Sequence, residues 1–148
     1  MSNSSRSPDA PPPAAQAAGK DRAGGTVEVG SGIDLMEAVR DHTEWRRRFR
    51  NAMAMQETLD AAPIAQDTSC ALGQWLHQDA VHRFRHLDTY WACLDAHAAF
   101  HLQAARVAHL INEKRYYAAE KMLAGGTAFS EASMAVGLAI IRLKKALS

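Results

Sequence analysis

The stretch LDTYWACLDAHAAFHLQAARVA, residues 87–108, decides the fold class because its apolar side chains recur at the spacing of a helix. Intervals of three and four residues place side chains on one face of a helix, whereas a strand requires alternation. No alternating run occurs elsewhere in the chain, and β-branched residues are sparse. We therefore expect a long helix over about 82–112 whose buried face carries Leu87, Tyr90 or Trp91, Leu94, His97, His101, Ala105 and Ala108.

The segments on both sides of this helix follow the same period. We expect a first long helix from residue 35, a short helix over about 69–79 and a last helix over about 114–146. Pro63 interrupts the first of these, Asp67, Thr68 or Ser69 supplies the N-cap of the short helix, and Gly125-Gly126 kinks or breaks the last one. The buried stripe of the first helix comprises Leu35, Val39, His42, Trp45, Phe49, Ala52 or Met53, and Leu59. The predicted fold class is all-α: a four-helix-bundle-like arrangement of three long helices and one short helix.

The N-terminal segment differs from the rest of the chain in composition. Residues 1–26 contain no Val, Ile, Leu, Phe, Tyr or Trp, and four of the five prolines lie before residue 14. Such a segment buries too little apolar surface to offset the entropy of ordering it. We predict a disordered tail over residues 1–31 and one helical domain over residues 32–148, which is long enough for one core.

Charge and cysteine content limit the classes of function. The 17 Lys and Arg residues against 16 Asp and Glu residues leave a formal charge of +1, which does not favour nucleic acid as a partner. No apolar run approaches the ~20 residues of a membrane helix, and the N-terminus lacks the apolar region of a secretory signal, so we expect no membrane insertion. The two cysteines, Cys70 and Cys93, are too few for a disulfide framework. We therefore expect a cytoplasmic protein with free thiols.

Three histidines and one cysteine carry the chemistry that the sequence offers. His97 and His101 are four residues apart, so they project from one side of a helix and suit two ligands of one metal ion. His42 lies on the buried stripe of the first helix. Cys70 stands three residues before Gly73, and a glycine inside a helix costs about 1 kcal/mol, which is reasonable where backbone or a ligand comes close to the sulfur. Three nitrogens and one sulfur suit four-coordinate zinc.

A structural role is the alternative for each of these residues. A histidine on an apolar face is more often a core residue hydrogen-bonded to a carbonyl, and a cysteine is often a small buried apolar residue. His77, His82 and His86 are expected to face water, and His109 to be structural. Cys93 lies one turn before His97, and we expect it either to pack in the core or to act as a second thiol that forms a disulfide with an oxidised Cys70.

The motifs HTEW, CALGQW and HAAFH occur in this order, and together they resemble the chemoreceptor zinc-binding (CZB) family. The resemblance covers about residues 34–147. It implies that the ligands of a bound zinc ion are His42, Cys70, His97 and His101, the residues that the spacing had indicated. It also implies a homodimer.

The resemblance further implies a function. Relatives join this domain to a chemoreceptor or a diguanylate cyclase and regulate it in response to zinc, or to oxidants such as hypochlorous acid. We therefore expect a bacterial regulatory module that signals through such a partner. The alternatives are a zinc buffer or carrier, or an interaction domain in which zinc is a permanent structural element. Four protein ligands leave no open position on zinc, so we expect no enzyme and no catalytic residue.

Overall fold

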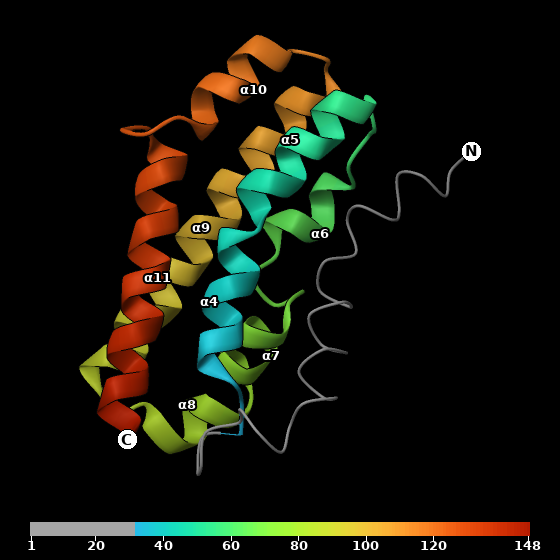
Figure 1. The fold of residues 1–148 in the computed structure, drawn as a ribbon. Coiled ribbons are helices and arrows are strands. Elements are labelled where there is room, and N and C mark those ends of the chain that lie inside the picture. Colours follow the sequence, from blue (N-terminus) through green and yellow to red (C-terminus); the bar gives the residue numbers. More distant parts are fainter. Residues whose placement is uncertain (1–31) are drawn as a thin grey trace.

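The computed structural model describes residues 32–148, and all of the regular secondary structure in that range is helical (Figure 1). The all-α prediction is confirmed for this part of the chain. The predicted tail over residues 1–31 lies outside the described residues. The helices are α4 (Leu35–Thr43), α5 (Trp45–Met55), α6 (Ala61–Ala65), α7 (Ala71–His77), α8 (Asp79–Phe84), α9 (Asp88–Asn112), α10 (Tyr116–Leu123) and α11 (Ala128–Leu147).

The predicted first long helix is present as α4 followed directly by α5. Asp34 caps α4, because its carboxylate accepts a hydrogen bond from the Glu37 N–H. Glu44 separates the two helices, but its own N–H still donates to the Arg40 carbonyl, so the chain hardly changes direction. Helix α5 ends at Gln56, which adopts the left-handed conformation common at helix C-termini (φ 54°). The helix therefore ends before Pro63, and Pro63 lies inside the short helix α6 instead.

Two further expectations about helix ends are resolved by the structure. The N-cap of α7 is Cys70, so the prediction of Asp67, Thr68 or Ser69 is wrong. The predicted helix over 82–112 is two helices, α8 and α9, and the predicted break at Gly125-Gly126 is confirmed between α10 and α11. Gly126 has a positive φ of 83°, a conformation that suits glycine.

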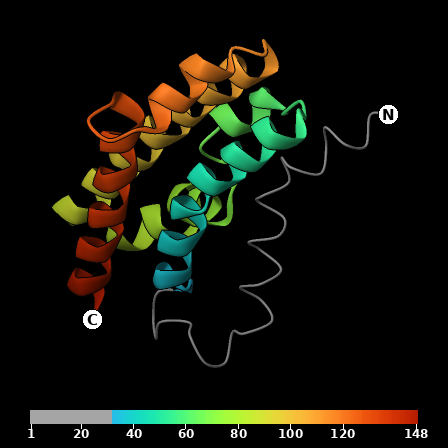
Figure 2. The same ribbon diagram turned by 45° about the horizontal axis from the view of Figure 1, so that its top comes forward.

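Helix α9 is the central element of the bundle. The pair α4–α5 and the antiparallel helix α11 lie along it, α6 lies against its other side, and α10 closes one end (Figures 1 and 2). The aromatic centre of the core is formed by rings from three helices: Phe49 of α5, Phe100 of α9 and Phe129 of α11. The ring centroid of Phe129 lies 6.0 Å from that of Phe49 and 5.7 Å from that of Phe100. Of the alternative positions in the predicted stripes, Ala52 and Tyr90 are buried, whereas Trp91 is 46 % exposed.

The C-terminal helices are more apolar than the sequence analysis allowed. By length and composition alone, Tyr116–Leu147 qualifies as a membrane-spanning stretch, contrary to the expectation that no apolar run approaches that length. In the structure this stretch is divided at Gly125-Gly126, and one side of α11 contributes Val136, Ile140 and Leu143 to the core. A core helix of a globular bundle meets the same criterion, so the composition alone decides nothing about membranes.

Candidate metal centre

Three elements bring four side chains together in the middle of the bundle. His42 comes from the last turn of α4, Cys70 is the N-cap residue just before α7, and His97 and His101 come from two successive turns of α9. One nitrogen from each imidazole and the Cys70 sulfur all lie within 4.8 Å of one another. These are the four residues that the sequence indicated. The three histidines are buried and Cys70 is half-buried.

The spacing of these atoms fits a tetrahedral metal site. The Nε2 atom of His97 lies 3.2 Å from that of His42 and 3.1 Å from that of His101. The sulfur lies 3.2 Å from Nε2 of His97, 3.5 Å from that of His101 and 3.8 Å from that of His42. With Zn–N of about 2.05 Å and Zn–S of about 2.3 Å, a tetrahedron separates two nitrogens by about 3.3 Å and a nitrogen from the sulfur by about 3.6 Å. Five of the six donor–donor distances are therefore close to those of a zinc tetrahedron, and all four atoms lie within 4.8 Å of one another.

Backbone carbonyls orient two of the imidazoles. Nδ1 of His42 donates to the Ala38 carbonyl (2.8 Å), and Nδ1 of His101 donates to the Ile64 carbonyl (2.9 Å). Because a carbonyl can only accept, these bonds place the proton on Nδ1 and leave the Nε2 lone pair facing the cluster. Nδ1 of His97 makes no hydrogen bond with any residue that the structure describes, so no carbonyl orients this ring from its outer side.

Gly73 is required because the backbone of Asp67 passes very close to it. A Cβ at this position would lie 1.6 Å from the carbonyl oxygen of Asp67 and 3.1 Å from the His97 ring, so no larger residue fits without displacing the chain. The Gly73 N–H also donates to the Cys70 sulfur (3.4 Å), which makes the sulfur the N-capping acceptor of α7. The glycine thus leaves room for the Asp67 carbonyl, and its N–H stabilises negative charge on the sulfur.

Burial shifts the protonation of all four side chains in the absence of metal. It lowers the pKa of His42 to about 4 and lowers the pKa values of His97 and His101, because a charged imidazole loses its hydration. Burial raises the pKa of the Cys70 thiol to about 11, although the N–H groups at the start of α7 partly oppose this shift. At neutral pH the cluster therefore holds three neutral imidazoles and one thiol. A metal ion that binds there must displace the thiol proton.

The comparison with protein families agrees with this geometry. Residues 42–108 match the model of the family described as the chemoreceptor zinc-binding domain (CZB). The chain contains a CZB domain. All four cluster residues lie within the matched range, and the family's description names zinc as its metal. The resemblance of the last helix, beyond residue 108, stays a prediction. No match was found among curated proteins or among solved structures.

Other candidate residues of the CZB domain lie outside the cluster. Cys93 is completely buried but is not part of it. His77 is exposed and lies 3.0 Å from a carboxylate oxygen of Asp67. His82 and His86 are exposed, as expected. His109 is exposed as well, so burial gives no support to the structural role expected for it.

Sequence reasoning missed the residues that orient the ligands. The Ala38 carbonyl lies one turn before His42 in the same helix, so a buried histidine in a helix could have suggested it. The Ile64 carbonyl belongs to a helix that the sequence did not predict, and it lies 37 residues from His101. No local pattern could have identified that contact.

Proposed function

We propose that this protein is a bacterial, cytoplasmic regulatory module in which His42, Cys70, His97 and His101 bind one zinc ion and in which loss or binding of the metal changes the packing of α4, α7 and α9. The convergence of the four donor atoms within 4.8 Å of one another carries the proposal. Because the ligands come from α4, from the N-cap of α7 and from α9, the metal adds a direct link between these segments. Such a module signals through a partner, for which a chemoreceptor or a diguanylate cyclase is the candidate.

Oxidants act on the same site through Cys70. Cys70 is the one residue of the four that is only partly buried, and its sulfur is the donor that a two-electron oxidant attacks. Hypochlorous acid takes two electrons from a thiolate, which gives a sulfenic acid and chloride. A sulfenic acid is a poorer zinc ligand than a thiolate, so zinc leaves and the helices loosen. The module would then report oxidant and zinc through one structural change.

The proposed site is regulatory and not catalytic. Four protein ligands complete the tetrahedral shell, so no position remains at which zinc could activate water. A zinc buffer or a permanent structural zinc would use the same ligands. The apolar core formed by Phe49, Phe100 and Phe129 favours a regulatory role over a structural one, because we expect a core of this kind to hold the fold when the metal is removed.

Metal analysis tests the proposal. Purified protein should contain one zinc per chain, and Cys70→Ala should lower the affinity for zinc strongly, with Cys93→Ala as the matched control. Hypochlorous acid should release zinc from the parent protein, and a reductant should restore binding. Retention of tightly bound zinc by Cys70→Ala would contradict the ligand set. Release of zinc that leaves the helix packing and every partner interaction unchanged would favour the buffer.

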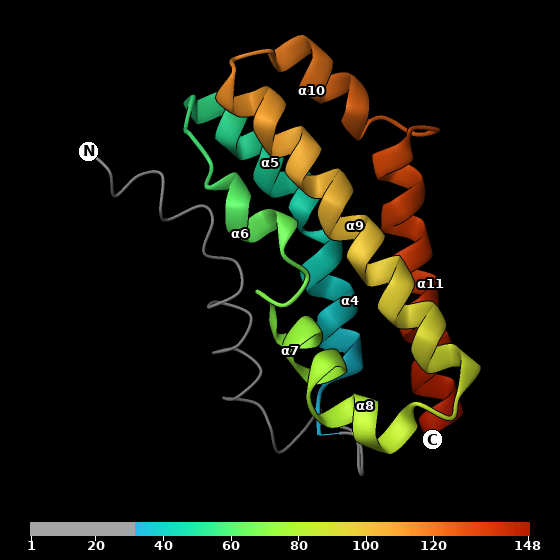
Figure 3. The same cartoon turned by 180° about the vertical axis from the view of Figure 1, so that it is seen from behind.

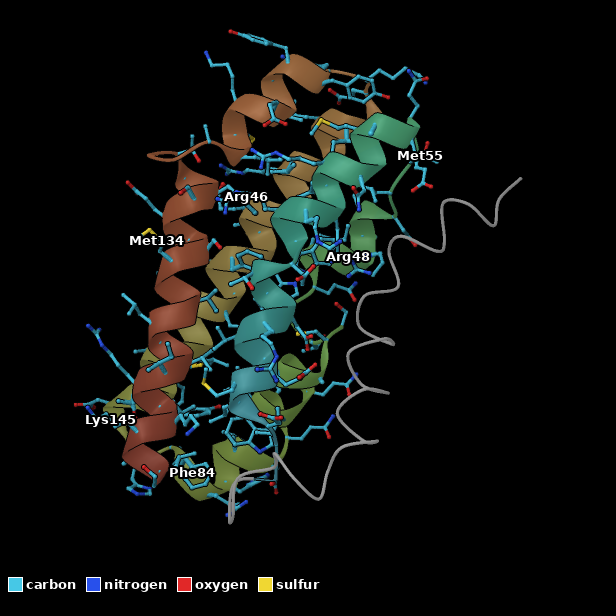
Figure 4. The ribbon with its side chains drawn as sticks, viewed as in Figure 1. Arg46, Arg48, Met55, Phe84, Met134 and Lys145 are labelled. Atoms are coloured by element: carbon cyan, nitrogen blue, oxygen red, sulfur yellow. The ribbon has the colours of Figure 1, made fainter. Side chains whose placement is uncertain are left out.

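A second copy of the chain is the partner for the outer face of α11, residues 131–145. Met134, Leu138 and Ile141 are exposed there by 67 %, 49 % and 42 %, and Figure 4 shows Met134 and Lys145 pointing away from the bundle. Leu138 lies seven residues from both Glu131 and Lys145. Two antiparallel copies of α11 crossing at Leu138 therefore bring each Glu131 to the partner's Lys145. Neither side chain has an ion-pair partner in the part of the chain that the structure describes.

Two details of this face support a close approach of another helix. A Cβ added to Gly137 would meet nothing within 4 Å, so packing within the chain does not require the glycine. Beside it, Ala92, Ala96, Ala135 and Ala139 line a groove of about 270 Å³ that can accept side chains of the opposing helix. A charge exchange tests the dimer by sedimentation: Lys145→Glu should weaken it and the double variant Glu131→Lys/Lys145→Glu should restore it. A parent protein that stays monomeric, or that binds lipid vesicles through this face, would refute it.

A further inference from the structure

The segment that covers one side of the metal cluster, residues 57–69, is held by two side chains of α9. This covering segment contains α6, which lies along α9 (Figure 3). Its Ile64 carbonyl accepts the hydrogen bond from Nδ1 of His101. The orientation of His101 therefore depends on where the covering segment lies.

Asn112 fixes the start of the covering segment. The Leu59 N–H donates to Oδ1 of Asn112 (2.7 Å), and Nδ2 of Asn112 donates to the Leu59 carbonyl (2.8 Å). One side chain thus satisfies both backbone groups of a residue that has no helical or strand partner. The Leu59 side chain is buried, so this part of the segment has little freedom to move.

The positions of Asn112 and His101 on α9 connect these two contacts. They are eleven residues apart, which is three helical turns, so both lie on the same face about 16 Å from each other. One face of α9 therefore makes both contacts: the amide of Asn112 bonds to the backbone of Leu59, and the imidazole of His101 bonds to the Ile64 carbonyl. At its other end the covering segment is fixed by Ser69, whose hydroxyl lies 2.7 Å from the Pro63 carbonyl, and by the fit of Asp67 against Gly73.

We propose that Asn112 is a positioning residue of the metal site: by fixing Leu59 it places the Ile64 carbonyl against Nδ1 of His101 and so keeps Nε2 of His101 turned toward the cluster. Asn112 lies outside residues 42–108 and touches none of the four cluster side chains. The inference rests on the proposed zinc site. It adds that the end of α9 determines part of the affinity for zinc.

The variant Asn112→Ala tests the proposal, with Arg106→Ala at an exposed position of α9 as the control. Loss of a group that orients a metal ligand lowers metal affinity 10- to 100-fold, and because Asn112 acts through the covering segment we expect about the lower value. Asn112→Asp keeps an acceptor for the Leu59 N–H and loses the donor to its carbonyl. It should preserve the fold and give an intermediate affinity.

Nuclear magnetic resonance of the metal-free protein supplies a readout that is independent of zinc. The Nδ1–H proton of His101 should exchange faster in Asn112→Ala, whereas that of His42, which is bonded to Ala38 within α4, should not change. Equal losses of melting temperature with and without zinc, together with parental zinc affinity and an unchanged His101 proton, would show a merely structural role and overturn the proposal. A parent protein that binds no zinc would refute the proposed function instead, while the proton-exchange result would still test the contact.

Discussion

Binding of zinc should release one proton per chain at neutral pH, and that proton comes from Cys70. Burial holds the pKa of His42 at about 4 and lowers those of His97 and His101, so above pH 6.5 the imidazoles have no proton to lose from Nε2. The pKa of the Cys70 thiol is about 11, so the thiol is protonated until zinc binds. The apparent affinity for zinc should therefore rise about tenfold per pH unit.

Because the pKa of Cys70 is raised, the affinity for zinc should go on rising with pH above pH 9. With a thiol pKa of about 11, the thiolate fraction still rises about ninefold between pH 9 and pH 10. With the ordinary value of 9.0, it would rise only about twofold over the same interval. The shape of the curve above pH 9 therefore reports the burial of the sulfur, whereas its slope at lower pH reports the number of protons.

Titration against a competing chelator at several pH values measures the affinity, and calorimetry in buffers of different ionisation enthalpy counts the protons. Cys93→Ala should also release one proton, because Cys93 is not part of the cluster. Cys70→Ser should release none and bind zinc weakly. Release of two or more protons from the parent at pH 7.5 would show that the histidines are charged without metal. A curve that flattens near pH 9 would refute the effect of burial on the thiol.

Three further predictions follow from the same residues. The metal-free protein should lose stability as pH falls from 6.5 toward 4, because His42 is protonated in the unfolded chain but stays neutral while it is buried in the fold. The shift in the pKa of His42 corresponds to about 3 kcal/mol of unfolding free energy, which urea unfolding at each pH measures. Gly73→Ala should lower both melting temperature and zinc affinity, because its Cβ would overlap the Asp67 carbonyl, whereas Gly125→Ala, where a Cβ meets nothing within 4 Å, should change neither. Chelation of zinc should leave the far-ultraviolet circular dichroism nearly unchanged but lower the melting temperature, and loss of all helical signal would indicate a structural zinc.

The sequence predicted the parts of this structure that depend on local spacing. The interval of four residues between His97 and His101 places both on one face of α9, and the apolar stripe tells which face is buried. Gly73 similarly indicated that backbone or a ligand comes close to the sulfur of Cys70, and the structure places the Asp67 carbonyl against Gly73. These features depend on residues within a few turns of each other.

Contacts between distant segments could not be predicted in this way. Nothing near Leu59 indicates that Asn112, 53 residues later, satisfies its backbone groups. The helix α6 was missed because Pro63 was interpreted as a breaker, although proline is tolerated in the first turn of a helix. Cys70 was predicted as a metal ligand but not as the N-cap of α7, because cysteine is not among the usual capping residues.

The two roles expected for Cys93, core packing or a disulfide with oxidised Cys70, are still to be tested. The side chain of Cys93 is fully buried, and burial raises its pKa to about 12, so its thiolate is scarce while the fold is intact. A cross-link would therefore require the bundle to loosen first. Mass spectrometry after mild oxidation should show that zinc leaves Cys93→Ser as readily as it leaves the parent protein, and a cross-link forming together with zinc release would contradict that expectation.

X-ray absorption spectroscopy at the zinc edge tests the central claim most directly, because it reports the atoms bound to the metal in the intact chain. The account predicts one zinc per chain with one sulfur at about 2.3 Å and three imidazole nitrogens at about 2.0 Å, and loss of the sulfur in Cys70→Ser. A shell with two sulfurs, a shell completed by water or carboxylate oxygen, or zinc that keeps its sulfur in Cys70→Ser would contradict it.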